Sequence, residues 1–202
     1  MSQIALPLDV RGSARPVRIV TGASNRAAVE ALSEPHSWPF RTALLVGPER
    51  AGKSLLAGWF AESGAGAALD DAHLADETTV FHAWNRAQER GQPLLLTARP
   101  GWRVALPDLA SRLVGSLQLE LLVPDDTLIA ELLAAHAEQR RLVLGEGAAA
   151  YLVPRIERSY AAVEAVVEAI DRLSLERQVP ATMSVWRDAL EAVHGPEQGR
   201  LL

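Results

Sequence analysis

Residues 47–54 read Gly47-Pro48-Glu49-Arg50-Ala51-Gly52-Lys53-Ser54, which fits the G-x-x-x-x-G-K-[ST] pattern of a phosphate-binding loop, or P-loop. The apolar run at 42–46 comes just before this octet and predicts a buried strand, and residues 54–62 predict a helix. Lys53 is the only lysine of the chain, against 19 arginines. A strand, a P-loop and a helix in succession predict an α/β protein that binds a nucleotide.

The P-loop pattern assigns a task to each of its defining residues. Glycines let backbone N–H groups turn toward phosphate oxygens, and the following helix adds its positive N-terminal end. We expect Gly47 and Gly52 to shape the loop, Lys53 to reach the outer phosphates of ATP or ADP, and Ser54 to hold Mg²⁺. The alternative, an ordinary glycine-rich turn, is disfavoured by the flanking strand and helix.

Composition narrows the class of protein. The 202 residues are 49% hydrophobic, contain no cysteine and carry a formal charge of −5. This composition predicts a folded cytoplasmic protein without disulfides, membrane span or metal site other than the Mg²⁺ of a nucleotide. Arginines dispersed among acids predict weak or no autonomous DNA binding, so a protein partner is the better expectation.

The chain has three predicted parts. Residues 1–16 read as a flexible arm, 17–123 as a nucleotide-binding core and 124–202 as a helical lid. In the core, strands are expected at 42–46, 67–69, 93–97 and 117–121, with helices at 24–33, 54–62 and 77–90. Ser24 and Asn25 are expected to cap the first helix. After Pro124 the pattern is helical throughout, with segments starting at Asp125 and at 146–153, 158–178 and 182–193. Alternating strands and helices predict a parallel sheet covered by helices.

Polar residues end two of the predicted strands. Asp70 and Asp71 follow the short strand at 67–69, and we expect Asp70 to orient Mg²⁺ through water and Asp71 to polarise an attacking water. A helix cap or exposed turn is the alternative for both acids. Thr97 ends the next strand, where a hydroxyl could contact the γ-phosphate or that water. Threonine is also a common strand residue, so this role stays open.

With these residues assembled, the chain resembles the DnaA-related AAA+ family, and within it the truncated Hda-type regulators. The resemblance rests on five segments: Ser24-Asn25-Arg26 before the P-loop, Asp70-Asp71 as the Walker B pair, 94–100 as the sensor 1 strand, Leu106 to Leu113 as the arginine-finger box, and Arg155 to Asp171 as the lid helix. The resemblance implies that Arg112 is the arginine finger, acting in trans on the nucleotide of a neighbouring subunit.

The N-terminal arm carries the feature most typical of the Hda type. Gln3-Ile4-Ala5-Leu6-Pro7-Leu8 resembles the peptide with which these regulators bind the DNA polymerase sliding clamp. An extended apolar peptide on a tether suits a groove on a partner, and proline lowers the entropy lost on ordering. We therefore expect Gln3, Leu6, Pro7 and Leu8 to contact the clamp. The alternative is an uninformative tail.

Three departures from the family pattern bear on activity. Ala98 follows Thr97 where the family often has an aspartate, Ala161 stands where the sensor 2 arginine is expected, and the second edge strand of the sheet is missing before Asp70. Losing phosphate contacts implies poor discrimination between ATP and ADP, and weak or no intrinsic ATPase activity. Residues 194–202 are also too few for the DNA-binding domain of an initiator.

Three functional hypotheses follow. The first is a negative regulator of replication initiation that binds the sliding clamp and stimulates ATP hydrolysis on DnaA through Arg112. The second is a DnaA-like adaptor or loader at the replication machinery that does not activate hydrolysis. The third is an independent P-loop ATPase acting on a small molecule. Homo-oligomers are compatible with all three.

Overall fold

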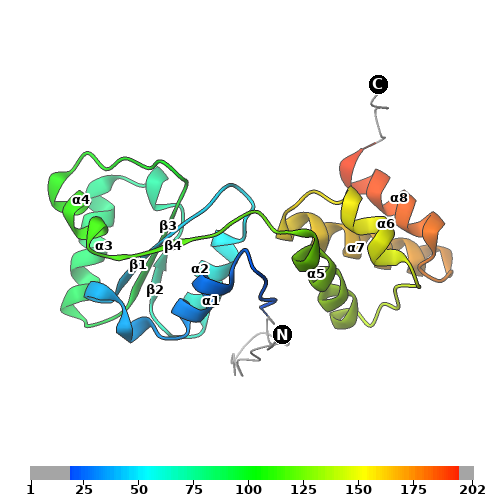
Figure 1. Cartoon of the computed structure of the whole chain (residues 1–202), viewed down its shortest axis with the longest axis horizontal. Helices are drawn as coiled ribbons and strands as arrows, with labels where there is room; N and C mark the ends of the chain where they lie inside the picture. Colours follow the sequence, from blue (N-terminus) through cyan, green and yellow to red (C-terminus); the bar gives the residue numbers. More distant parts are fainter. Residues whose placement is uncertain (1–18, 196–202) are drawn as a thin grey trace. The chain divides into compact units, whose positions relative to one another are not determined.

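The structure is a computed structural model, and it describes residues 19–195. The peptide bond between Val123 and Pro124 divides the chain into two compact units. Each unit is described by itself (Figure 1). The predictions for residues 1–16, including the clamp peptide, concern a part of the chain outside the described residues.

The first unit is built on a four-stranded parallel sheet. Its strands are β1 (Thr42–Val46), β2 (Ala67–Leu69), β3 (Leu94–Ala98) and β4 (Leu117–Glu120), in the order β2-β3-β1-β4. All three strand pairs are parallel, with Leu45 of β1 opposite Thr97 of β3 and Leu69 of β2 opposite Leu96 of β3. The predicted α/β class with a short parallel sheet is confirmed.

Helices cover both faces of this sheet, as Figure 1 shows. Successive strand residues point to opposite faces, so Leu45 and Leu95 pack with α1 (Arg26–Leu32) and α2 (Lys53–Glu62). Leu94 and Leu96 pack on the other face, with α3 (Glu77–Glu89) and α4 (Pro107–Val114). A sheet buried on both faces explains why its strands are almost continuously apolar.

The expected absence of a second edge strand is also confirmed. Within the described residues β2 pairs with β3 alone and is an edge of the sheet. The segment between α2 and β2 is only a short turn, and β2 itself has three residues. As a result, Asp70 and Asp71 follow directly from the outermost strand.

The second unit consists of helices: α5 (Asp126–Gln139), α6 (Ala148–Leu152), α7 (Tyr160–Arg177) and α8 (Met183–His194). Helix α7 packs against both α5 and α8. Its buried side chains recur at helical spacing, as do those of its neighbours: Leu128, Ile129, Leu132 and Leu133 in α5, Val163, Val166, Val167 and Ile170 in α7, and Val185, Trp186 and Ala189 in α8.

The N-caps of α5 and α1 lie where the sequence predicted them, but only the cap of α5 forms the expected side-chain hydrogen bond. Asp125 accepts a hydrogen bond from the Leu128 N–H at the start of α5, as expected of an N-cap. Asn25 occupies the N-cap position of α1 without a side-chain cap bond. Instead its side chain accepts from the Gly22 N–H and donates to the Val20 carbonyl, which fastens the preceding segment to α1. The predicted N-cap position of Asn25 is therefore correct, but its side chain does not form the expected cap bond.

Candidate nucleotide site

The P-loop connects β1 to α2 and needs its two pattern glycines for different reasons. A Cβ on Gly47 would lie 2.8 Å from the Leu121 carbonyl oxygen, so only glycine fits against this neighbouring segment. Gly52 has φ +95° and ψ +11°, a left-handed conformation that glycine adopts without strain, and it begins α2. The loop thereby turns sharply into the N-terminus of a ten-residue helix. Ser54, the second residue of that helix, is exposed.

Lys53 is buried under its own loop. Its ammonium donates to the Gly47 carbonyl at 2.8 Å and to the Pro48 carbonyl at 2.6 Å. Burial lowers the pKa of Lys53 from its ordinary value, while the nearby Asp71 and Asp70 carboxylates act in the opposite direction. The ammonium therefore bonds to loop carbonyls and lies near two acids, and its contact with the outer phosphates of a nucleotide stays a prediction.

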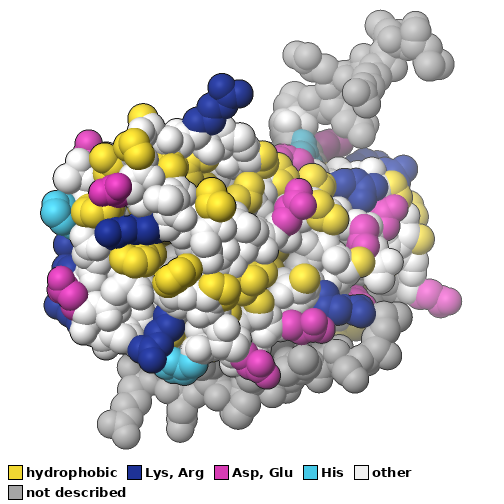
Figure 2. All heavy atoms as spheres, turned by 60° about the vertical axis from the view of Figure 1, so that its left-hand side comes forward, with side chains coloured by type: hydrophobic (Ala, Val, Ile, Leu, Met, Phe, Trp, Pro, Cys, Tyr) yellow, Lys and Arg dark blue, Asp and Glu magenta, His cyan; other side chains and the backbone are white. Residues whose placement is uncertain are grey.

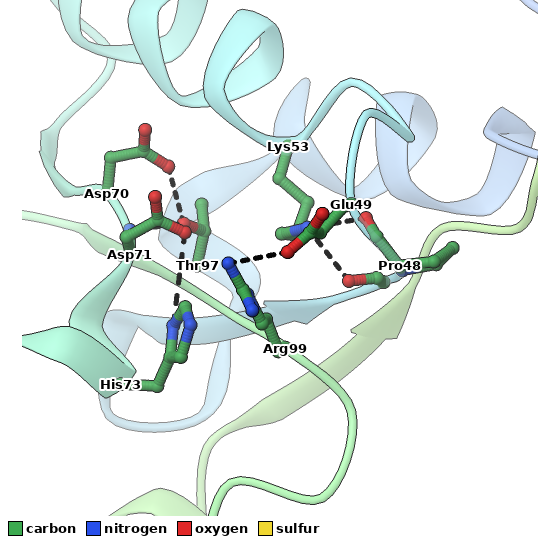
Figure 3. A network of polar contacts seen from close by, with 9 residues as sticks. Pro48, Glu49, Lys53, Asp70, Asp71, His73, Thr97 and Arg99 are labelled. Carbon is green, nitrogen blue, oxygen red and sulfur yellow. Dashed lines mark hydrogen bonds and ion pairs between the residues drawn. The ribbon is translucent and has the colours of Figure 1, made fainter. Parts of the chain in front are cut away.

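Thr97 joins the two aspartates, as Figure 3 shows. The side chain is fully buried; its hydroxyl donates to Asp70 Oδ1 at 2.5 Å and accepts from the Asp71 N–H at 2.8 Å. The parallel pairing of β2 with β3 brings these residues together across 26 and 27 positions of sequence. Thr97 thus holds the turn at Asp70 and Asp71 in place. The sequence did not predict these two hydrogen bonds.

The conformation of Asp71 is unusual for a residue with a side chain. Its φ of +48° and ψ of +44° are left-handed, and it precedes the short 3₁₀ helix Ala72–Leu74 without a side-chain cap bond. The carboxylate lies 3.9 Å from Nδ1 of His73. Among the described residues neither ring nitrogen of His73 has a hydrogen-bond partner, although both are buried. The backbone at Asp71 directs its carboxylate away from a capping role.

A second polar contact joins the P-loop to the end of β3. Arg99, the first residue after that strand, places Nη2 at 2.6 Å from Oε1 of Glu49 in the loop. Figure 3 shows this pair beside Lys53. Neither residue was selected from the sequence as part of the site, although Glu49 lies inside the P-loop pattern and Arg99 directly follows the Thr97 strand.

The donor set fits a nucleotide with Mg²⁺. Lys53 supplies a cation, α2 begins at the loop, and Ser54 and Asp70 supply exposed oxygens of the kind that Mg²⁺ prefers. Within residues 19–195 no cluster of three or more histidine, aspartate or glutamate side chains is arranged to hold a metal ion. Mg²⁺ at this site would accordingly share its coordination among few protein groups, phosphate oxygens and water.

Arg112 lies on a different part of the first unit. It belongs to the last turn of α4, three residues before Gly115 and close to where β4 begins, whereas the P-loop follows the end of β1. Its guanidinium is 4.2 Å from the ring centroids of both Phe81 and Trp84 of α3, and it donates to Asn85 Oδ1. Arg112 is therefore held by α3 in this structure.

Ala161 occupies the position in α7 at which the family resemblance implies the sensor 2 arginine. Ala161 is exposed in the first turn of α7. Arg158, just before that helix, pairs with Asp126 at 2.8 Å and donates to the Pro124 carbonyl. Its charge is thus engaged within the second unit.

Comparison with solved structures identifies the fold. The crystal structure of domain III of the Thermotoga maritima replication initiation protein DnaA matches with a TM-score of 0.74 at 13% identity, covering 88% of this chain and 95% of that one. The chain has the AAA+ fold of DnaA domain III. No family model matches its sequence.

Two further AAA+ structures are similar. AMPPCP-bound DnaA from Aquifex aeolicus matches with a TM-score of 0.61 at 17% identity, covering 80% of this chain and 66% of that one. The Thermotoga maritima RuvB Holliday junction branch migration motor matches with a TM-score of 0.64 at 16% identity, covering 84% of this chain and 68% of that one. Identities this low show the AAA+ fold alone, and this chain spans about two thirds of those two proteins.

Within residues 19–195 no helix combines the length and the apolar character needed to cross a bilayer.

Proposed function

We propose that this protein binds ATP or ADP with Mg²⁺ at the P-loop, and that it is a negative regulator of chromosome replication initiation. In this proposal the arm residues Gln3, Leu6, Pro7 and Leu8 bind the DNA polymerase sliding clamp. The AAA+ unit associates with DnaA, and Arg112 stimulates hydrolysis of the ATP that DnaA carries. The protein's own site has weak or no ATPase activity.

The observation that carries the proposal is the position of Arg112 relative to the protein's own P-loop. Arg112 lies in the last turn of α4, near the amino end of β4, whereas the P-loop at 47–54 follows the opposite, carboxyl end of β1. An arginine so placed does not serve the nucleotide site of its own unit. It suits the nucleotide site of a neighbouring protein, where positive charge assists phosphoryl transfer.

The surface of the first unit suits a protein partner. On the face that Figure 2 shows, apolar side chains lie between basic and acidic ones, and the charges are interspersed rather than gathered by sign. Exposed apolar side chains of this unit include Phe40, Leu74 and Val114. Nucleic-acid-binding surfaces are instead typically dominated by a basic patch or stripe.

At its own nucleotide site the chain supplies binding and orientation. The Lys53 ammonium neutralises phosphate charge, the α2 N-terminus adds donors, and Thr97 fixes the positions of Asp70 and Asp71. Mg²⁺, when bound, neutralises phosphate charge and orients water. With neither a sensor 2 arginine in α7 nor an aspartate after Thr97, these residues favour retention of the nucleotide over its turnover.

One observation favours the second hypothesis, an adaptor that does not activate hydrolysis. Arg112 lies between Phe81 and Trp84 and donates to Asn85, so a finger would first have to leave these contacts. Contacts between a cation and aromatic faces contribute about 0.5–2 kcal/mol each. An adaptor would keep Arg112 in this position, with the arginine contributing only to the packing of α3 on α4.

Single-turnover hydrolysis of ATP preloaded on DnaA distinguishes the two. We expect this protein to accelerate hydrolysis when DNA-loaded clamp is present, and Arg112→Ala to remove the acceleration without affecting clamp binding. Arg86→Ala, an exposed arginine of α3, is the matched control and retains full stimulation. Stimulation by Arg112→Ala at the wild-type rate would show that the finger assignment is wrong, and no stimulation by wild-type protein would favour the adaptor.

A further inference from the structure

The ion pair between Glu49 and Arg99 links two segments that surround the candidate phosphate position. Glu49 belongs to the P-loop and Arg99 follows β3, and their charged atoms are 2.6 Å apart (Figure 3). Both side chains are largely exposed, at 64% for Glu49 and 51% for Arg99. Exposed pairs of this kind contribute little to folding, so stability alone does not account for an arginine here.

Arg99 lies close enough to Lys53 for the two positive charges to interact. Burial is the main reason that the pKa of Lys53 is lowered, and the Arg99 guanidinium acts in the same direction. Two neighbouring cations repel each other and weaken a fold unless anions share their space. In the present structure those anions are Glu49, Asp70 and Asp71.

We propose that Arg99 binds the terminal phosphate of a nucleoside triphosphate, and that Glu49 is an internal anion that occupies Arg99 when no triphosphate is bound. This inference rests on the proposed nucleotide site and adds a residue that distinguishes triphosphate from diphosphate. The planar guanidinium offers a fork of donors that matches either a carboxylate or a phosphate. Glu49 can therefore be replaced by a phosphate on the same arginine.

The location of Arg99 selects the terminal phosphate over the inner ones. The inner phosphates of a P-loop ligand lie against the loop amides and the start of the following helix, here α2. Arg99 follows the strand whose Thr97 holds Asp70 and Asp71, the acids assigned to Mg²⁺ and water. This is the side of Lys53 where the outermost phosphate is expected. A released Glu49 carboxylate would remain hydrated because it is already exposed.

The exchange predicts opposite effects for the two partners. Without Arg99 the terminal phosphate loses a charge-assisted contact and also meets an unpaired Glu49 carboxylate. Without the charge of Glu49, Arg99 can bind the phosphate without first breaking an ion pair, so the affinity for triphosphate rises. A simple surface ion pair, by contrast, would leave the affinities for triphosphate and diphosphate unaffected or change both equally.

Calorimetric titration of the full chain with Mg²⁺ and either AMPPCP or ADP tests the proposal. We expect Arg99→Ala to weaken AMPPCP binding about tenfold or more, while ADP binding changes less than about twofold. Arg99→Lys keeps the charge but not the fork and is expected to lie between Arg99→Ala and wild type. Glu49→Gln is expected to tighten AMPPCP binding about two- to fivefold.

The controls separate this inference from the proposed site. Arg86→Ala is expected to bind both ligands like wild type, and thermal unfolding of each variant verifies that it is folded. Equal changes for AMPPCP and ADP in Arg99→Ala, or weaker AMPPCP binding by Glu49→Gln, would overturn the role of Arg99 while leaving the nucleotide site intact. A wild-type protein that binds neither ligand would overturn the site itself, and this inference with it.

Discussion

At the scale of single residues, the Thr97 hydroxyl contributes to folding and is also proposed to position a Mg²⁺ ligand. The hydroxyl is fully buried and is satisfied by the Asp70 carboxylate and the Asp71 N–H, so it contributes to folding. The same two bonds fix the position of a proposed Mg²⁺ ligand. Thr42 of β1 offers a comparison, because its buried hydroxyl donates to the Phe40 carbonyl at 3.0 Å but touches neither aspartate.

Thr97→Val is predicted to affect stability and ligand binding together. Valine preserves the shape but leaves the Asp71 N–H without its acceptor, so we expect the free energy of unfolding to fall by about 1–3 kcal/mol in urea titrations. Mg²⁺-dependent AMPPCP affinity is expected to fall as well, because Asp70 loses its orientation. Thr42→Val is expected to lower stability only. Unchanged AMPPCP affinity in Thr97→Val would exclude a positioning role for this hydroxyl.

Single residues also show what the sequence could and could not predict. The need for glycine at Gly47 and Gly52 was predictable because the P-loop pattern specifies a backbone shape, whereas the phosphate contact of Lys53 stays a prediction. The bonds of Thr97 were not, because they depend on how β2 and β3 align, which local patterns do not determine. The contact of Arg99 with Glu49 is likewise long-range and was missed.

At the scale of elements, helix α5 contains a histidine in an unfavourable environment. Among the described residues, Nδ1 of His136 is buried without a hydrogen-bond partner. Burial lowers the pKa of His136, with Arg140 acting in the same direction and Glu164 opposing. The imidazole is therefore more easily protonated in the unfolded chain than in the folded one.

This difference predicts how stability depends on pH. Because the folded-state pKa is the lower one, the unfolded chain binds more protons as the pH falls below about 6.5, and the free energy of unfolding decreases there. We expect His136→Leu to reduce the loss in melting temperature between about pH 8 and about pH 5, measured by circular dichroism. His36→Leu, at an exposed position, serves as control. Equal pH dependence in wild type and His136→Leu would assign the loss to other groups.

Helices and strands were predictable where apolar residues recur at regular spacing along the sequence. The strand at 42–46 and the helical segments from Asp125 onward were recovered from apolar periodicity, because burial on one or two faces imposes it. Helix α4 was not identified as a helix, although Pro107 at its first position and the buried Leu109 and Leu113 four residues apart are typical of one; the segment was interpreted only through its resemblance to the arginine-finger box. The packing of Arg112 on α3 was also missed, because contacts between two helices that are separate in sequence do not follow from the spacing within either helix.

At the scale of the whole molecule, the fold tolerates almost complete replacement of its residues. Domain III of Thermotoga maritima DnaA shares 13% of its residues with this chain and still superposes over 88% of it. What the two must share is the alternation of strand and helix that buries a parallel sheet on both faces. This alternation made the fold class predictable from the sequence. Partners and activity depend on individual surface residues, so they are proposed above from the details of the site.

The burial of Lys53 has a practical consequence, since the whole chain contains no other side-chain amine. A lowered pKa leaves more of this amine neutral and reactive, while its bonds to the Gly47 and Pro48 carbonyls shield it. Reductive methylation with ¹³C-formaldehyde would therefore install one side-chain reporter, at the base of the P-loop.

Saturating Mg²⁺ and AMPPCP are expected to slow this methylation, and a dimethyl-Lys53 resonance would shift when the ligand is added to protein labelled beforehand. Peptide mapping after labelling identifies the modified residue. An unchanged rate of Lys53 methylation at saturation would place the ligand elsewhere. A chain with a single lysine among 19 arginines thus isolates, in one spectrum, the amine proposed to bind the phosphates of the nucleotide.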